Sequence, residues 1–278
     1  MLAPLTLGTT GTLIATEYAL LKAGAERIRP TASVFDTSRY APDAVSRARR
    51  LWSDRMVNEY TSTSVFTQLA AQLMEANAPL DATAVTLRMA QDELRHAEIC
   101  RDVVRAMGGE GSRMRETGVA IIARHPGCSD EERALRNVIF TTCLSEMNSV
   151  SYFVAVLERM TDPYLRDVTR RLLADEVLHG RFGFTYLESC AAWLGARPEV
   201  RASIGRYLRF AFAVVEREFT AGENVAAKSE SADDDALGIV CAGTSAEIFR
   251  ETMIAAVIPG LERFDIPAED AWNRRTLG

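Results

Sequence analysis

The sequence predicts an all-α protein. Between Pro42 and Gly195, long segments carry apolar residues at helical spacing with almost no β-branched alternation, and the helix breakers fall between them. Four such segments form two hairpins joined by a longer connection, which is typical of a four-helix bundle. We expect all 278 residues to form one domain, in which an N-terminal extension (1–41), the bundle (about 42–195) and a C-terminal helical lid or wrap (196–278) follow one another.

The first hairpin is predicted from two helices with a short connection. The first helix should begin at Pro42, because proline suits the first turn, and should end near Asn77. The second should run from Asp81, a suitable N-cap, to the glycine pair Gly108 and Gly109. Because the connection is short, the two helices should be antiparallel neighbours.

The second hairpin is predicted to follow a crossover loop. Residues 108–128 have little periodicity and contain five glycines. Ser129, with Glu132 three residues later, indicates a capping box at the start of the third helix. The fourth helix should begin at Asp162, which precedes a proline, and end near Gly195.

The regions on either side of the bundle are predicted to be partly helical. Before the bundle, only residues 15–27 have a clear helical pattern. After it, helices are expected over 199–220 and 233–261, with an interruption at Gly243. These C-terminal helices should wrap or cover the bundle.

The composition excludes several classes of protein. With 47% hydrophobic and 25% charged residues, the chain matches soluble globular proteins. It contains no apolar run long enough to span a bilayer and no basic region typical of a signal peptide, so we expect a cytoplasmic protein with no membrane partner. A net charge of -6 makes nucleic acid an unfavourable partner. The five cysteines form no Cys-x-x-Cys pair, which argues against a disulfide framework or a cysteine-ligated metal.

Two of the three histidines share one motif. His96 follows Glu93, and His179 follows Glu176, at a spacing of three residues, and an aspartate precedes each glutamate. On a helix this spacing places a carboxylate and an imidazole on one face, where both can bind one ion. A single such pair is more often a solvated surface pair. The third histidine, His125, lies in the crossover loop and should be structural or exposed.

Each of the other two bundle helices carries a glutamate among apolar or small residues, Glu59 on the first and Glu146 on the third. A carboxylate on an apolar helix face is costly to bury unless a cation compensates for it. The four glutamates together carry the charge that two divalent cations neutralise. We therefore infer a dinuclear metal site in the bundle core, with the predicted ligands Glu59, Glu93, His96, Glu146, Glu176 and His179.

From Trp52 to Leu194, the order Glu, Asp-Glu-x-x-His, Glu, Asp-Glu-x-x-His resembles the ferritin-like di-iron carboxylate superfamily. The segment DELRHAE (92–98) is similar to the motif of soluble acyl-carrier-protein desaturases and bacterial multicomponent monooxygenases. The resemblance implies a ferritin-like four-helix bundle with a long crossover between its second and third helices. It also implies two iron ions and O2 as co-substrate, although hard oxygen and nitrogen ligands suit manganese or a mixed pair as well.

The resemblance implies a role for each motif residue. One iron would be bound by Glu59, Glu93 and His96, and the other by Glu146, Glu176 and His179, with one glutamate of each half able to bridge. Asp92 and Asp175 would each hydrogen-bond a ligand histidine of the opposite motif.

The implied chemistry is reductive activation of O2, followed by hydroxylation, desaturation, cleavage or N-oxidation of a small or carrier-bound organic substrate. The chain has no convincing Gly-x-Gly-x-x-Gly or cluster motif, so an external ferredoxin or flavin reductase should supply the electrons. A homodimer is a further expectation.

At some positions the sequence differs from the motifs of individual subfamilies, which argues against membership in those subfamilies. Cys100 stands where ribonucleotide reductase small subunits carry the radical-forming tyrosine, and Leu172 stands where arylamine N-oxygenases carry a further histidine. A ferritin needs only one histidine motif and a shorter chain, and a rubrerythrin usually brings a Cys-x-x-Cys iron domain, so we expect that neither fits this chain well. The alternative function is a ferroxidase or peroxide-scavenging iron protein without an organic substrate. A structural or interaction protein with a vestigial site is a third reading.

Small and aromatic side chains near the ligands predict a cavity for substrate and O2. Small residues at helical offsets from the ligands would leave space, and aromatic residues farther along the same faces would form walls. Thr63 and Thr142 could also relay a proton, although buried threonines often bond their own helix carbonyls. The predicted lining residues are Thr63, Phe66, Thr142, Ser149, Phe153, Gly183 and Tyr186.

Overall fold

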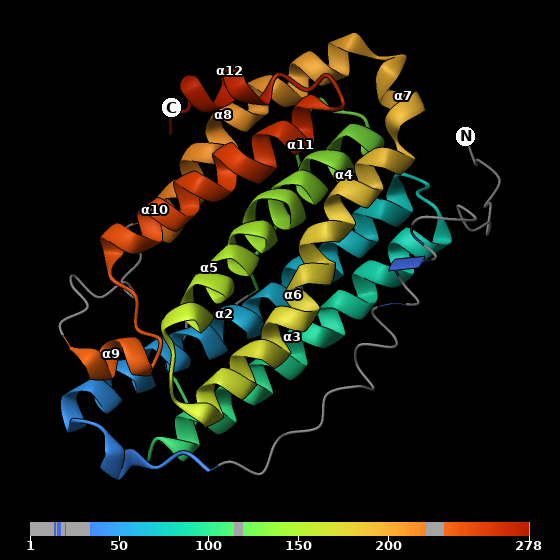
Figure 1. Ribbon diagram of the computed structural model, residues 1–278. Helices are drawn as coiled ribbons and strands as arrows, with labels where there is room; N and C mark the ends of the chain where they lie inside the picture. The colour runs from blue at the N-terminus through green and yellow to red at the C-terminus, as the bar shows by residue number, and fades with distance from the viewer. Residues whose placement is uncertain are drawn as a thin grey trace.

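The four predicted bundle helices are present in the computed structural model (Figure 1). The structure describes residues 34–113, 119–220 and 231–277, together with residues 14, 16, 17 and 20. No β-strand occurs in these ranges, so the all-α prediction is confirmed. The bundle elements are α2 (Pro42–Glu75), α3 (Leu80–Ala106), α4 (Asp130–Val138), the π-helical segment η2 (Ile139–Glu146), α5 (Met147–Arg159) and α6 (Pro163–Ser189). The third bundle helix is therefore continuous from α4 to α5 but contains a π-helical insertion.

The starts of the third and fourth bundle helices are capped as the sequence predicts. The backbone N–H of Glu132 donates to Ser129 Oγ at 3.3 Å. At the start of α6, the backbone N–H of Leu165 donates to Asp162 Oδ1 at 2.9 Å. Each side chain satisfies a backbone donor that the first helical turn leaves unpaired.

The predicted N-cap at Asp81 is wrong. α3 begins at Leu80, with Pro79 in the capping position, so Asp81 lies inside the first turn. Its Oδ1 accepts from the adjacent backbone N–H of Ala82 at 3.1 Å. Proline fixes its own φ near the helical value, and this conformation starts the helix earlier than the side-chain cap would.

The bundle pairs its helices in two antiparallel hairpins. α2 packs along α3, α6 packs along η2 and α5, and α3 contacts α6 between the two hairpins. Figure 1 shows these four long helices side by side, joined by the crossover between α3 and α4. His125 in the crossover has a structural role, since its Nε2 lies 3.2 Å from Asn137 Oδ1 and its ring packs edge-on against Tyr207.

The C-terminal elements cover one side of the bundle. α8 and α10 lie beside the third bundle helix, and α12 packs on α8 (Figure 1). Near the start of α2, Arg47 Nη2 forms an ion pair of 2.7 Å with the buried Asp234 of α9. The elements after the bundle are α7 (Ala191–Gly195), α8 (Pro198–Thr220), α9 (Ala232–Ala236), α10 (Ala242–Thr252), the π-helical segment η3 (Met253–Val257), α11 (Ile258–Glu262) and α12 (Ala268–Asn273).

Two helix boundaries differ from the prediction. The break in the last predicted helix falls at 237–241, where Gly238 has a φ of +75°, a left-handed conformation that glycine adopts readily, and Gly243 lies inside α10. The fourth bundle helix ends at Ser189, and the short α7 continues to Gly195. Most of the predicted 15–27 helix lies outside the described residues.

The core of the bundle consists of two apolar clusters with a polar layer between them. One cluster contains Phe66, Met89 and Phe182, and the other contains Trp52 and Leu172. On α2 and α6, the predicted metal ligands lie between these positions. None of the helices in the described ranges combines the length and the hydropathy that a membrane span needs.

Candidate metal centre

The six predicted ligands converge in the polar layer. They form two groups, within each of which the candidate ligand atoms lie within 4.8 Å of one another. The first group is Glu59, Glu93, His96 and Glu176, and the second is Glu93, Glu146, Glu176 and His179. Because Glu93 and Glu176 belong to both groups, each could bridge two ions. The geometry agrees with the expectation of one bridging glutamate from each half.

The Nδ1 atom of each histidine faces the carboxylates. His96 Nδ1 lies 3.3 Å from Glu176 Oε1 and 3.5 Å from Glu59 Oε2. His179 Nδ1 lies 3.2 Å from Glu93 Oε1 and 3.9 Å from Glu146 Oε2. Each imidazole therefore contacts glutamates from both hairpins, and the site is complete only when α2, α3, η2 and α6 pack together.

The Nε2 atom of each histidine faces an aspartate of the opposite motif. His96 Nε2 lies 3.1 Å from Asp175 Oδ2, and His179 Nε2 lies 3.5 Å from Asp92 Oδ2. Both aspartates are buried, with exposed fractions of 1% for Asp92 and 4% for Asp175. A carboxylate in this position accepts the Nε2 proton and leaves Nδ1 free to bind a cation.

Arg95 connects the two aspartates, which the sequence analysis did not anticipate. Its Nη2 lies 3.0 Å from Asp92 Oδ1 and 2.5 Å from Asp175 Oδ2. Arg88 Nη2 also lies 3.0 Å from Asp92 Oδ1. The spacing of three or four residues from Asp92 on α3 could have indicated both arginines, because such residues share a helix face.

The close packing of acids and imidazoles shifts their pKa values. Burial, together with the charge of Glu176, raises the pKa of Glu93 to about 8, although contact with His179 acts in the opposite direction. Burial alone would lower the pKa of His179, but the carboxylates of Asp92 and Glu93 raise it to about 10. Burial would raise the pKa of Glu176, but close contacts with Glu146 and His96 lower it to about 2. A metal ion that binds here must displace protons from the cluster.

Several buried atoms of the cluster have no hydrogen-bond partner among the described residues. They include four candidate metal-ligand atoms, Glu93 Oε1, His96 Nδ1, Glu176 Oε2 and His179 Nδ1, as well as His179 Nε2. Buried polar atoms without a partner are costly unless an ion or water satisfies them. The four candidate ligand atoms indicate a cation site, because carboxylate oxygens and unprotonated imidazole nitrogens are ligands for hard and borderline divalent metals. The residues present therefore fit a pair of metal ions.

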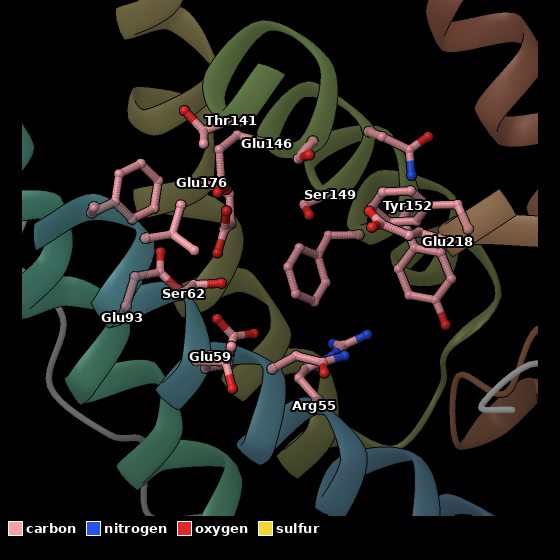
Figure 2. Close-up of a pocket in the computed structure, with 18 of the residues that line it drawn as sticks. Arg55, Glu59, Ser62, Glu93, Thr141, Glu146, Ser149, Tyr152, Glu176 and Glu218 are labelled. Atoms are coloured by element: carbon pink, nitrogen blue, oxygen red, sulfur yellow. The ribbon is translucent and has the colours of Figure 1, made fainter. Parts of the chain in front are cut away.

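The π-helical segment η2 decides which residues share the face of Glu146. An α-helix aligns residues four apart, whereas a π-helix aligns residues five apart. Thr141, five residues before Glu146, consequently lines the cavity beside it, as Figure 2 shows. The predicted Thr142 is fully buried, and its Oγ1 donates to the Val138 carbonyl at 2.6 Å.

A cavity of about 690 Å³ opens beside the cluster. Glu59, Glu93, Glu146 and Glu176 border it at one end, and Arg55 lies toward the other (Figure 2). This volume is within the range of small-molecule binding sites. The C-terminal region contributes part of the wall through Glu218, Phe219, Val240 and Ser245.

Three of the seven predicted lining residues, Phe66, Ser149 and Phe153, line this cavity. Thr63 does not; it borders a second cavity of about 380 Å³, and its Oγ1 donates to the Glu59 carbonyl at 3.4 Å. Ser62, three residues after Glu59 rather than four, occupies the expected place. The helix rotates by about 100° per residue, so offsets of three and four diverge by that angle.

Gly183 and Tyr186 are also placed elsewhere. A Cβ atom on Gly183 would overlap Thr142 Oγ1 and lie 2.5 Å from Cys143 Sγ, so this glycine allows α6 and η2 to approach closely. Tyr186 is 4% exposed and packs beside Phe182 in an apolar cluster. The sequence pattern identified small and aromatic residues near the ligands but not the direction in which each one points.

The cavity also contains polar residues that the sequence analysis did not identify. The most informative are Arg55, one helical turn before Glu59, and Asn148, two residues after Glu146. The position of Arg55 could have been deduced from its four-residue spacing to Glu59. Asn148 follows the π-helical insertion, so its position at the cavity cannot be deduced from α-helical spacing to Glu146.

Residues 56–183 match the family model described as Rubrerythrin. The matched segment contains all six predicted ligands and both aspartates, and the chain contains no Cys-x-x-Cys pair. No curated protein and no solved structure matches the chain.

Proposed function

We propose that this protein, whose residues 56–183 belong to the ferritin-like di-iron carboxylate superfamily, is an O2-dependent oxygenase or oxidase of an organic substrate. The observation that supports this proposal most directly is the cavity of about 690 Å³, which four of the candidate metal ligands border. A cavity of this size beside the metal centre can hold a small molecule or the end of a carrier-bound chain. The reaction would be hydroxylation, desaturation, cleavage or N-oxidation.

Two iron ions would supply the redox chemistry that O2 activation requires. The residues of the chain would hold and orient them, with Glu59, Glu93 and His96 on one ion and Glu146, Glu176 and His179 on the other. Asp175 and Asp92 would favour the tautomer of each imidazole that carries its proton on Nε2, so that Nδ1 would remain available as a ligand. Manganese or a mixed pair would suit the same atoms.

The walls of the cavity would position the substrate. Phe66, Phe140 and Phe153 provide apolar surface near the carboxylates, and Ser149 is a small polar residue between the two ends of the cavity (Figure 2). Thr141 also places a hydroxyl group on the cavity face, although its Oγ1 donates to the Asn137 carbonyl at 2.7 Å. This bond occupies the hydroxyl proton within its own helix.

The reductant is proposed to be a separate protein, a ferredoxin or a flavin reductase. O2 is the oxidant, and the donor supplies the electrons that the organic substrate does not. A separate reductant is consistent with the described residues, in which the candidate redox centre is the cluster of carboxylates and histidines.

The proposal is tested by loading the full chain with Fe(II) without oxygen and then mixing it with O2. We expect O2 uptake and a transient visible absorption. A Glu176→Ala variant is the matched control, because Glu176 belongs to both candidate ligand groups. Absence of O2 uptake by the iron-loaded protein would contradict the proposal.

The family match favours a second candidate, a ferroxidase or peroxide-scavenging iron protein. The same carboxylate and histidine cluster would serve, and no organic substrate would be needed. The two candidates differ in what consumes the oxidant. Rapid oxidation of excess Fe(II), or reduction of hydrogen peroxide without any requirement for an organic compound, would favour the second.

A further inference from the structure

Arg55 is the cationic side chain of the cavity. Apart from the four candidate ligands, the charged lining residues are Arg55 and Glu218. No ion pair joins Arg55 to a carboxylate within the part of the chain that the structure describes. The side chain of Glu218 is exposed, although burial of its carboxyl group raises its pKa and favours the neutral form, whereas Arg55 is partly buried. Arg55 is therefore the charged group that a ligand in the outer part of the cavity would meet.

Three aromatic rings hold the guanidinium of Arg55 in place. Its central carbon lies 4.4 Å from the ring centroid of Phe153, 5.1 Å from that of Trp52 and 5.4 Å from that of Tyr152. Aromatic rings attract a cation without using its N–H groups, and of the five N–H donors of the guanidinium the Tyr152 hydroxyl takes up one in a hydrogen bond. A guanidinium that is already oriented can bind a carboxylate through two parallel hydrogen bonds with little further loss of side-chain entropy.

Asn148 provides a second and independent indication of a ligand. Its side chain lines the same cavity and is 2% exposed, and its Oδ1 has no hydrogen-bond partner among the described residues. An unpaired buried acceptor costs free energy, which a donor on a bound molecule would recover. A ligand that carries an N–H or O–H group beside its anionic group would gain this contact in addition to the one with Arg55.

The sequence positions place the anion site relative to the candidate metal centre. Arg55 and Glu59 lie four residues apart on α2, which corresponds to about 6 Å along the helix axis and the same face. Figure 2 shows Arg55 on the far side of Glu59 from Glu93, Glu146 and Glu176. A molecule bound to Arg55 can thus extend past Glu59 along the aromatic wall toward the carboxylate cluster.

We propose that the cavity binds a small organic acid, whose carboxylate pairs with Arg55 and whose apolar part lies beside the metal centre. This inference rests on the proposed function for the reaction that follows binding. Without a cation the four glutamates would repel an anion, but two divalent ions neutralise them. Arg55 then makes the cavity favour anionic ligands. A neutral analogue of the acid cannot form the ion pair with Arg55.

The test is isothermal titration calorimetry of the full-length, iron-loaded protein under anaerobic conditions. The probes are phenylacetate, phenyl phosphate and the neutral 2-phenylethanol. We expect phenylacetate to bind roughly tenfold more tightly than 2-phenylethanol, or more, as a charge-assisted pair predicts. Equal binding of the neutral probe, tighter binding of phenyl phosphate, or no binding of phenylacetate would overturn the organic-acid assignment.

Variants separate the role of Arg55 from a general effect on the fold. Arg55→Gln should lose the roughly tenfold preference for phenylacetate, while Arg55→Lys should retain part of it, because the charge remains and the planar fork is lost. The matched control is Arg263→Gln, since Arg263 lies over the Phe264 ring at 5.9 Å and its side chain is 73% exposed. Wild-type preference in Arg55→Gln, with normal circular dichroism, would contradict the inference.

The proposed function can fail separately from this inference. Iron content and O2 uptake of the unmodified protein test the proposed function and do not involve Arg55. If iron binding and O2 uptake are present but the preference for the carboxylate is absent, only the organic-acid assignment is wrong. If iron is not bound, the proposed function is wrong.

Discussion

The carboxylate of Asp175 on α6 lies 3.1 Å from Nε2 of His96 on α3. The reciprocal pair, Asp92 on α3 and His179 on α6, is separated by 3.5 Å. Each Asp-Glu-x-x-His motif therefore orients the histidine of the other, and Arg95 contacts both aspartates. The two halves of the candidate metal centre are therefore connected by contacts between protein side chains alone.

Asp175→Asn should weaken Fe(II) binding by roughly 10- to 100-fold, the usual effect of losing a partner of a metal-bound histidine. The amide no longer carries the charge that favours the Nε2 proton, and Arg95 loses one of its acidic contacts. Titration of Fe(II) against a competing chelator measures the change. Glu98→Gln, which alters an exposed carboxylate on α3, the helix that carries His96, is the control. Unchanged affinity in Asp175→Asn would show that this contact does not orient a ligand.

Glu176→Ala and His179→Ala should each abolish binding of at least one ion. The loss should be greater in Glu176→Ala, because Glu176 belongs to both candidate ligand groups and His179 to one. Elemental analysis after iron-supplemented expression gives the metal content per chain. Retention of two ions by either variant would show that the ligand assignment is wrong.

Gly183→Ala should reduce the free energy of unfolding by about 1–3 kcal/mol, as expected for overpacking a buried contact. The added methyl group would overlap Thr142 Oγ1 and lie 2.5 Å from Cys143 Sγ, and both of these residues are fully buried. Urea denaturation provides the measurement. Gly195→Ala is the matched control, because a Cβ atom there meets nothing within 4 Å. Equal stability of the two variants would contradict the close approach of α6 to η2.

Removal of bound metal by a chelator should lower the melting temperature. An ion present at a hundredfold excess over its Kd stabilises the folded state by about 2.7 kcal/mol, which corresponds to several degrees for a chain of this size. The buried carboxylates of Glu93, Glu146 and Glu176 make the effect specific to this layer of the core. Differential scanning calorimetry of metal-loaded and metal-free protein measures it, and readdition of Fe(II) should restore the higher temperature. Coincident transitions would argue against a metal centre in the core.

Much of the fold could be predicted from local sequence. Proline, serine and aspartate marked the starts of α2, α4 and α6, because each of them satisfies or avoids an unpaired backbone N–H in the first turn. The six predicted ligands could be named for a similar reason. A glutamate and a histidine three apart share a helix face in any α-helix, and carboxylates at apolar positions need compensation wherever that helix packs.

The cavity depended on information that α-helical spacing does not contain. Because of the π-helical segment, Thr141 rather than Thr142 lines the cavity. Because helical offsets of three and four differ by about 100° in direction, Ser62 rather than Thr63 lines it. Gly183 is small because α6 approaches η2, not because a ligand needs space.

By itself, the sequence determined the helix type, the order of the helices and the identity of the residues able to bind metal. These properties follow from contacts between residues a few positions apart on one helix. Only the tertiary structure decided that Glu93 and Glu176 are shared by both groups, that each aspartate faces the histidine of the other motif, and that Arg55 lies among three rings at the cavity. These relationships join helices that are distant in sequence, and their geometry is set by how the helices pack.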